Sequence, residues 1–199
     1  MDVTAAMVKE LREKTGVGMM KCKEALAEAA GDLAEAEKIL RKQGMATAAK
    51  KSGRATGEGL VASYIHTGGK IGVLVEVNCE TDFAARSGDF QELVRGIAMH
   101  VAAAAPRFVR REEVTADLLE SEREIARDQA SKSGKPPQVV DKIVEGKLEK
   151  FFAEVCLLEQ PYVRDPERSV GQLVADLVAK IGENIQVRRF VRFVLGDAA

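Results

Sequence analysis

The sequence of 199 residues contains few of the side chains from which metal and thiol sites are built. It holds two histidines, and its three cysteines, Cys22, Cys79 and Cys156, lie far apart and form no Cys-x-x-Cys pair. Structural zinc sites draw their ligands from closely spaced cysteines and histidines, so no metal centre is expected. An odd number of widely spaced cysteines also predicts reduced thiols with a structural role rather than a disulfide framework.

Long apolar runs and an excess of one charge are missing too. No apolar run approaches the roughly 20 residues that span a bilayer, and the N-terminal Met-Asp-Val-Thr lacks the basic start and apolar core of a secretion signal. Basic residues number 30 and acidic residues 31, so no overall field draws the protein to a nucleic acid or a membrane surface. We expect a cytoplasmic protein of one or two domains, with no membrane partner and no direct nucleic-acid partner.

The sequence motifs of common enzymes are also missing. There is no phosphate-binding Gly-x-x-x-x-Gly-Lys-Ser/Thr loop, no Gly-x-Gly-x-x-Gly after a strand and no Gly-x-Ser-x-Gly elbow. Cys79 could serve as a nucleophile, but the negative charge of the adjacent Glu80 would raise its pKa and leave little thiolate. We therefore expect a protein that is not an enzyme and needs no cofactor. A small thiol enzyme is an alternative, which activity surviving Cys79→Ser would exclude.

The first part of the chain has the pattern of three short helices between Thr4 and Gly44. Thr4 is a suitable N-cap, and the glycines of Gly16-Val17-Gly18 break the first helix because they leave the backbone too free to continue it. Residues 32–35, Asp-Leu-Ala-Glu, have the spacing of a capping box for the third helix. Gly44 is expected to end that helix. Of Met19 and Met20, we expect one to fill the core and the other to lie in the exposed turn.

A basic segment follows at residues 38–54. It contains six basic residues and no acidic one, so it could bind RNA as a flexible arm. It has no aromatic side chain to stack on bases, which favours a solvated linker that includes the end of a helix. The sequence thus predicts two domains: residues 1–53, with the helical bundle and the basic linker, and residues 54–199, with an α+β core.

The core is predicted to be a three-stranded antiparallel sheet covered by helices. Residues 60–67 and 71–78 alternate in polarity with a period of two, and Gly68-Gly69 between them suits a hairpin turn. Residues 185–195 alternate in the same way and predict a strand with one apolar face. The resulting fold class is α+β.

Four helices are predicted around this sheet. Phe90 begins a helical pattern that Pro106 closes, and Thr115 opens an acidic helix that the Ser-Gly-Lys-Pro-Pro run at 133–137 ends. Two amphipathic helices then flank a polar loop that contains Pro161 and Pro166. We expect these last two helices to pair as an antiparallel hairpin over residues 137–181.

The stretch around which the chain is organised is residues 76–86, Glu-Val-Asn-Cys-Glu-Thr-Asp-Phe-Ala-Ala-Arg. It begins as the end of a strand and stops at Thr81-Asp82, two residues that favour helix caps and turns. Phe83 follows before any helical pattern has started. An aromatic side chain at such a place either folds back into its own core or is held out to fill the pocket of another protein. General burial tendencies favour the core.

Three blocks of the sequence resemble the elongation factor Ts family of bacteria, the guanine nucleotide exchange factors for elongation factor Tu. They are residues 76–86, residues 11–26 (Leu-Arg-Glu-Lys-Thr-Gly-Val-Gly-Met-Met-Lys-Cys-Lys-Glu-Ala-Leu) and residues 178–190 (Val-Ala-Lys-Ile-Gly-Glu-Asn-Ile-Gln-Val-Arg-Arg-Phe). The predicted N-terminal helices resemble the ubiquitin-associated-type bundle with which that family begins. One departure is Ala84, where the family commonly has the larger valine.

This resemblance implies a partner and two sets of site residues. The partner is elongation factor Tu, both bound to GDP and free of nucleotide. The segment that would enter its nucleotide domain and dislocate Mg²⁺ comprises Thr81, Asp82, Phe83 and Ala84. A second contact is implied for Arg12, Val17, Gly18, Met19 and Met20. Longer members of the family carry two related halves in the core, so this chain is expected to supply the second half by forming a homodimer.

Overall fold

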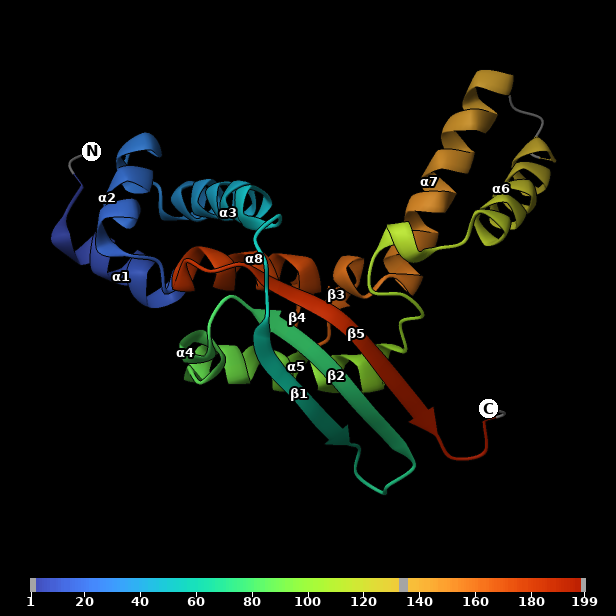
Figure 1. Cartoon of the computed structure of the whole chain (residues 1–199). Helices are drawn as coiled ribbons and strands as arrows, with labels where there is room; N and C mark the ends of the chain where they lie inside the picture. The colour runs from blue at the N-terminus through green and yellow to red at the C-terminus, as the bar shows by residue number, and fades with distance from the viewer. Residues whose placement is uncertain (1–2, 133–135, 198–199) are drawn as a thin grey trace. The chain divides into compact units, whose positions relative to one another are not determined.

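The computed structural model describes residues 3–132 and 136–197 and has the expected α+β architecture (Figure 1). Contacts between Cα atoms divide the chain into two compact units, and each unit takes segments from distant parts of the sequence. The first combines Met1–Ala62, Glu76–Arg95 and Gln172–Arg188, and the second combines Ser63–Val75, Gly96–Gly171 and Arg189–Ala199.

Three helices form a small bundle within the first unit: α1 (Ala5–Thr15), α2 (Met19–Glu28) and α3 (Leu33–Lys51). Apolar residues recur at three- and four-residue spacing along these helices, so each helix turns one stripe towards the others. The shared core consists of Leu11, Cys22, Ala25, Leu26, Ala36 and Leu40. The predicted N-terminal bundle is thereby confirmed.

The predicted caps of this bundle are largely confirmed. The Thr4 hydroxyl accepts a hydrogen bond from the Met7 N–H at 3.3 Å, and the Asp32 carboxylate accepts one from the Glu35 N–H at 2.9 Å. Gly16 ends α1 with a left-handed φ of 69°, a conformation that glycine adopts without steric cost. The expected return bond of the capping box is replaced by an ion pair between Glu35 and Lys38.

The prediction that Gly44 ends the third helix is wrong, because α3 continues to Lys51. Gly44 is buried, and a Cβ at this position would lie 3.6 Å from the Cβ of Ala179. Ala179 belongs to α8 (Val170–Ile181). The glycine therefore allows two helices to approach closely rather than stopping one of them. Much of the basic segment 38–54 is accordingly helical and not a linker.

The sheet has the strand order β1-β2-β5, with β1 (Glu58–Ile65), β2 (Ile71–Cys79) and β5 (Ile185–Val194). The arrows in Figure 1 run in alternating directions, as the sequence predicts. Gly68 and Gly69 join β1 to β2 with φ angles of 92° and 69°, as a tight hairpin turn requires. Along β2 every second side chain from Val73 to Cys79 is buried, whereas Leu74 between them is exposed.

Strand β5 departs from the single apolar face predicted for residues 185–195. Ile185 and Val187 are buried, but Arg188 and Arg189 are both exposed. From Arg189 onwards the odd-numbered residues, which were buried before, are the exposed ones. Beyond this point Arg192 donates hydrogen bonds to the carbonyl oxygen of Ala102. Three apolar side chains therefore face solvent instead of the core: Val191, Phe193 and Leu195.

Helix α5 (Gly88–Ala104) carries a buried histidine that ties it to the chain beyond α7 (Pro137–Val155). His100 Nε2 lies 2.9 Å from Gln160 Oε1, and His100 Nδ1 accepts the N–H of Val163 at 3.3 Å. The Gln160 amide nitrogen also donates to the carbonyl oxygens of Ala104 and Glu154. One buried pair thus satisfies backbone groups at the ends of two helices.

The helical hairpin differs from the predicted one over residues 137–181. Helix α7 (Pro137–Val155) pairs with the preceding helix α6 (Ala116–Ser131), which Thr115 caps as expected. Their common core consists of Ala126, Ala130, Val140 and Val144. Between α7 and α8 the chain forms the short antiparallel pair β3 (Pro161–Tyr162) and β4 (Asp165–Ser169) instead of a plain loop.

The predicted helix stop at residues 133–137 falls partly outside the described residues, which resume at Pro136. At the base of the hairpin, Arg111 of the short helix η1 (Arg111–Glu113) pairs with Glu149 on α7 and with Glu159. Its guanidinium also lies 4.5 Å from the ring centre of Phe152. Within residues 3–132 and 136–197, no helix is both long and apolar enough to cross a membrane.

Candidate partner-binding site

The 81–84 segment, named here for Thr81, Asp82, Phe83 and Ala84, lies where β2 turns into a short helix. Thr81 keeps an extended backbone, with φ −132° and ψ 155°, and its hydroxyl accepts a hydrogen bond from the Ala84 N–H at 3.2 Å. It is therefore the N-cap of α4 (Asp82–Ala85). The predicted change from strand to cap at Thr-Asp is confirmed.

Two side chains of the segment point outwards and one points inwards. Phe83 is 84% exposed, although burial tendencies alone favour the core. Asp82 is also exposed and pairs with Arg86 at 3.0 Å. Ala84 is buried, so it packs against the protein itself. Of the four residues, Asp82 and Phe83 are thus displayed, whereas Thr81 and Ala84 attach the segment to the fold.

The structure adds a pair of residues at this site that the sequence did not single out, Glu183 and Asn184. The Glu183 carboxylate accepts hydrogen bonds from the Thr81 N–H at 3.0 Å and from the Thr81 hydroxyl at 2.7 Å. In return, the Asn184 N–H donates to the Glu80 carboxylate at 2.6 Å. Both residues lie in the third block of family resemblance, which was the only signal in the sequence that marks them.

Cys79 is not arranged as a nucleophile. Its side chain is buried and donates a hydrogen bond to the Thr81 carbonyl oxygen at 3.1 Å. Burial raises the pKa of the Cys79 thiol, and the Glu183 carboxylate raises it further. The sequence predicted the direction of this shift but named Glu80 as its cause. A thiol that stays protonated is a poor nucleophile, so the geometry favours the structural role.

The 17–20 turn, named here for Val17, Gly18, Met19 and Met20, links α1 to α2. Met19 is 58% exposed and Met20 is 68% exposed, so the expectation that one of them fills the core is wrong. Thr15 and Val17 occupy the space beside Cys22 instead: the Cys22 thiol bonds to the Val17 carbonyl oxygen at 3.4 Å. Two adaptable apolar side chains are therefore displayed together.

Arg12 and Gly18 complete the predicted second contact. The Arg12 side chain is exposed in the last turn of α1, and its carbonyl oxygen accepts the N–H of Gly16 at 2.8 Å. Gly18 caps α2 without a side-chain bond. The 17–20 turn and the 81–84 segment both belong to the first compact unit.

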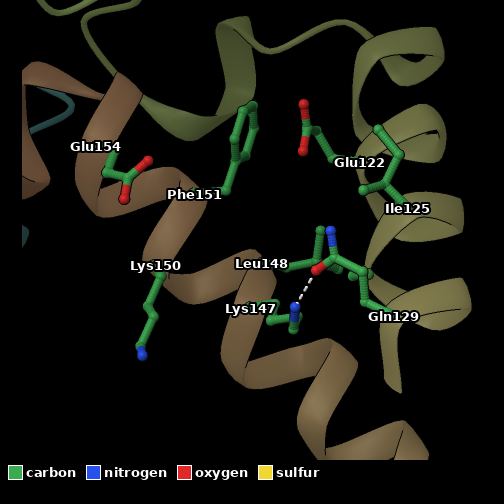
Figure 2. A pocket seen from close by; sticks show the side chains of 9 residues that line it. Glu122, Ile125, Gln129, Lys147, Leu148, Lys150, Phe151 and Glu154 are labelled. Atoms are coloured by element: carbon green, nitrogen blue, oxygen red, sulfur yellow. Dashed lines mark hydrogen bonds between the residues drawn. The ribbon is translucent and has the colours of Figure 1, made fainter. Parts of the chain in front are cut away.

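A groove of about 310 Å³ lies between α6 and α7, away from these segments in the sequence (Figure 2). Lysines and glutamates line it together with Ile125, Leu148 and Phe151, and Lys147 donates a hydrogen bond to Gln129 across it. The lining contains no histidine or cysteine. Among the described residues as a whole, no group of three or more His, Cys, Asp and Glu side chains could hold a metal ion.

Comparisons with known proteins agree over nearly the whole chain. The sequence model of the family described as Elongation factor TS matches residues 2–197. A protein named Elongation factor Ts from Anaeromyxobacter sp. (strain Fw109-5) is 63% identical over 196 residues, which cover 98% of this chain and 90% of the relative. The proteins of the same name from Heliobacterium modesticaldum and Solibacter usitatus are 60% and 58% identical, over 98% and 99% of this chain and 91% and 93% of the relatives.

These matches include both the 17–20 turn and the 81–84 segment. The helical bundle, the three-stranded sheet and the exposed strand-to-helix turn stand at the positions that the three sequence blocks indicate. The chain belongs to the elongation factor Ts family.

Proposed function

We propose that this protein binds elongation factor Tu carrying GDP in the cytoplasm and accelerates the release of GDP, and so its exchange for GTP, during translation elongation. The observation that carries the proposal is Phe83, a large apolar side chain that is 84% exposed in the short helix α4, just after β2. An apolar group held in solvent has no benefit for folding. It gains free energy when a partner buries it.

Exchange of this kind requires no covalent chemistry. GDP dissociates slowly from a translational GTPase because the phosphate-binding loop and Mg²⁺ together hold the β-phosphate. A protein that binds the nucleotide-free form more tightly than the GDP-bound form weakens GDP binding by the same factor, since the coupling between two ligands is reciprocal. The chain therefore acts as an exchange factor and not as an enzyme.

Within this mechanism the displayed residues have distinct roles. Phe83 wedges between side chains behind the Mg²⁺ site of the partner and dislocates the ion indirectly. Asp82 accepts a hydrogen bond from the partner. Thr81 and the buried Ala84 hold the segment in place. An aromatic side chain that fills a desolvated pocket contributes about 2 kcal/mol or more, or roughly thirtyfold in affinity.

The 17–20 turn supplies a second contact with the nucleotide domain. Met19 and Met20 are exposed, unbranched and polarizable, so they fit a foreign surface at little conformational cost. Arg12, in the last turn of the preceding helix, adds a positive charge to this contact. In this mechanism Phe83 acts on the ion, so the second contact contributes to binding rather than to Mg²⁺ dislocation.

The test is the release of a fluorescent GDP analogue from purified elongation factor Tu in the presence of Mg²⁺. The intact chain is expected to accelerate release, and Phe83→Ala is expected to lose most of that gain while keeping its fold. Ile125→Ala is the matched control, because it also removes an exposed apolar side chain but lies on α6. Equal acceleration by the wild type and Phe83→Ala would contradict the wedge.

No acceleration by the wild type would contradict the exchange function. Binding to RNA that weakens with added salt would then favour the alternative carried by residues 38–54.

We also propose that two copies of the chain associate through the sheet. Five apolar residues of the second unit are partly or largely exposed: Ile65, Leu74, Val191, Phe193 and Leu195. Monomeric proteins rarely leave such side chains uncovered, and β1 and β5 are the two outer strands of the described sheet, where another strand could pair. Sedimentation equilibrium is expected to give a dimer for the wild type and a monomer for Phe193→Lys. A wild type that stays monomeric at high concentration would contradict the proposal.

A further inference from the structure

The short helix α4 cannot hold the 81–84 segment in place by itself. It contains four residues, Asp82–Ala85, and a single turn fixes several dihedral angles for very few hydrogen bonds, so it is unstable in isolation. Phe83 buries little of its own surface there and contributes no packing. The order of the segment must therefore come from contacts with other parts of the chain.

Every polar backbone and side-chain atom of Thr81 has a partner. Its carbonyl oxygen accepts the Cys79 thiol at 3.1 Å and the Ala85 N–H at 3.2 Å, and its hydroxyl oxygen accepts the Ala84 N–H. The two remaining donors, the N–H and the hydroxyl hydrogen, both go to one carboxylate, that of Glu183. Among the residues that the structure describes, Glu183 is thus the one charged partner of Thr81 and the only one from a distant part of the sequence.

Glu183 is itself held by its neighbours. Asn184, buried beside it, donates its backbone N–H to Glu80 at 2.6 Å, and that hydrogen bond lowers the pKa of Glu80. The Asn184 side chain also donates to the carbonyl oxygen of Arg54 at 2.8 Å. Residues 80–81 and 183–184 therefore exchange hydrogen bonds in both directions. Such a reciprocal pair fixes position and orientation more firmly than one bond does.

We propose that Glu183 is a positioning residue for exchange: its carboxylate holds Thr81 so that Phe83 is presented in the orientation the partner accepts. This inference rests on the proposed function, because it concerns how the same segment is prepared for binding. A segment that is ordered before binding loses less conformational entropy on binding. Glu183 reaches the partner only through Thr81 and Phe83 and need not touch it.

The experiment compares Glu183→Gln, Thr81→Val and the double variant in the GDP-release assay. Glutamine has the size of glutamate, but its amide group offers one acceptor oxygen where two are needed. Hydrogen bonds to charged groups are among the stronger ones, so each single variant is expected to slow release about tenfold. The double variant is expected to lose less than the sum of the two single losses, because both variants remove the bond between the Thr81 hydroxyl and Glu183. Thr81→Ser restores the hydroxyl and is expected to recover most of the rate lost in Thr81→Val.

A second readout separates positioning from general stability. Hydrogen exchange of the Thr81 and Ala84 amides is expected to be about tenfold faster in Glu183→Gln, while the bundle and the other strands keep their protection. Glu120→Gln on α6 is the matched control, because it also neutralises a glutamate, one that pairs with Arg123 on the same helix and lies far from Thr81 in the sequence. If Glu183→Gln fails to fold, Thr81→Val and its rescue by Thr81→Ser still test the hydrogen bond between the Thr81 hydroxyl and Glu183.

The outcomes distinguish this inference from the proposed function. If Phe83→Ala loses its acceleration of GDP release but Glu183→Gln accelerates release as much as the wild type, the positioning role is wrong and the exchange function stands. Additive losses in the double variant would also overturn it. If Phe83→Ala is as active as the wild type, the proposed wedge fails and the role of Glu183 fails with it.

Discussion

The aliphatic part of Lys180 lies against Gly16. A Cβ added to Gly16 would be 3.3 Å from both Cδ and Cε of Lys180, and the Lys180 ammonium pairs with Asp89 at 2.7 Å. Lys180 therefore connects the turn before Met19 with the start of α5. The end of α8 thus lies beside Gly16, which precedes the 17–20 turn, and Glu183 just after this helix bonds to Thr81 of the 81–84 segment. Both proposed contacts are anchored on the same few residues.

Gly16→Ala is expected to disturb the 17–20 turn. Gly16 has a left-handed φ of 69°, which costs an alanine about 1 to 2 kcal/mol, and its new methyl group would crowd Lys180. We expect a loss of about that size in the free energy of unfolding, with a higher concentration of the chain needed for half-maximal GDP release. Chemical denaturation and the release assay measure the two effects.

Gly146→Ala is the matched control for this substitution. Gly146 lies inside α7, and a Cβ there would meet no atom within 4 Å. Alanine in a helix interior is more stable than glycine by roughly 0.5 to 1 kcal/mol, so this variant should be slightly stabilised. Equal destabilisation of both variants would contradict the role assigned to Gly16.

Replacing Met19 and Met20 together by glutamine should weaken binding and leave the fold intact. Both side chains are exposed, so their loss opens no cavity. We expect the concentration for half-maximal GDP release to rise about tenfold, with little change in the maximal rate, because the proposed role of these side chains is to bind the partner and not to act on the ion. Met45→Gln is the control, since Met45 is half exposed on α3. A fall in the maximal rate with unchanged half-saturation would contradict this assignment.

His100 should make the stability depend on pH. Burial lowers the pKa of His100, although its hydrogen bond with Gln160 opposes the shift. As the pH falls below about 6.5, the unfolded chain takes up a proton that the native protein does not. The contribution of His100 to the free energy of unfolding is therefore complete above about pH 6.5. It decreases below that pH, by at most about 1.4 kcal/mol per pH unit for one proton.

The test compares denaturation at pH 5.5 and pH 7.5, both chosen to lie about one unit either side of the ordinary histidine value. His100→Gln is expected to lower stability at both pH values but to flatten the difference between them. His66→Gln, which alters the exposed histidine at the end of the hairpin strand, should keep the wild-type difference. An unchanged difference in His100→Gln would show that other groups cause it.

The features that the sequence predicts correctly depend on neighbouring residues. Thr4, Asp32 and Thr115 act as N-caps because a hydroxyl or carboxylate three residues before a free N–H is enough to cap it. The turn at Gly68 and Gly69 follows from their own backbone freedom. Such local rules need no knowledge of the rest of the fold.

The failures involve partners that are distant in the sequence. Gly44 was expected to end a helix but accommodates Ala179, which lies in another helix. The amphipathic face of α7 predicted a partner helix correctly but not which one, because α6 and α8 both offer apolar stripes. Glu183 could be found only from the fold, since its bonds to Thr81 span about a hundred positions of the chain.

The central claim is that the 81–84 segment accelerates exchange by dislocating Mg²⁺ from the partner. The most direct measurement is the GDP release rate over a series of Mg²⁺ concentrations down to excess chelator, with the wild type, with Phe83→Ala and without either. The advantage of the wild type over Phe83→Ala is expected to be largest at high Mg²⁺ and to disappear when the ion is removed. An advantage that stays the same at every Mg²⁺ concentration would contradict it.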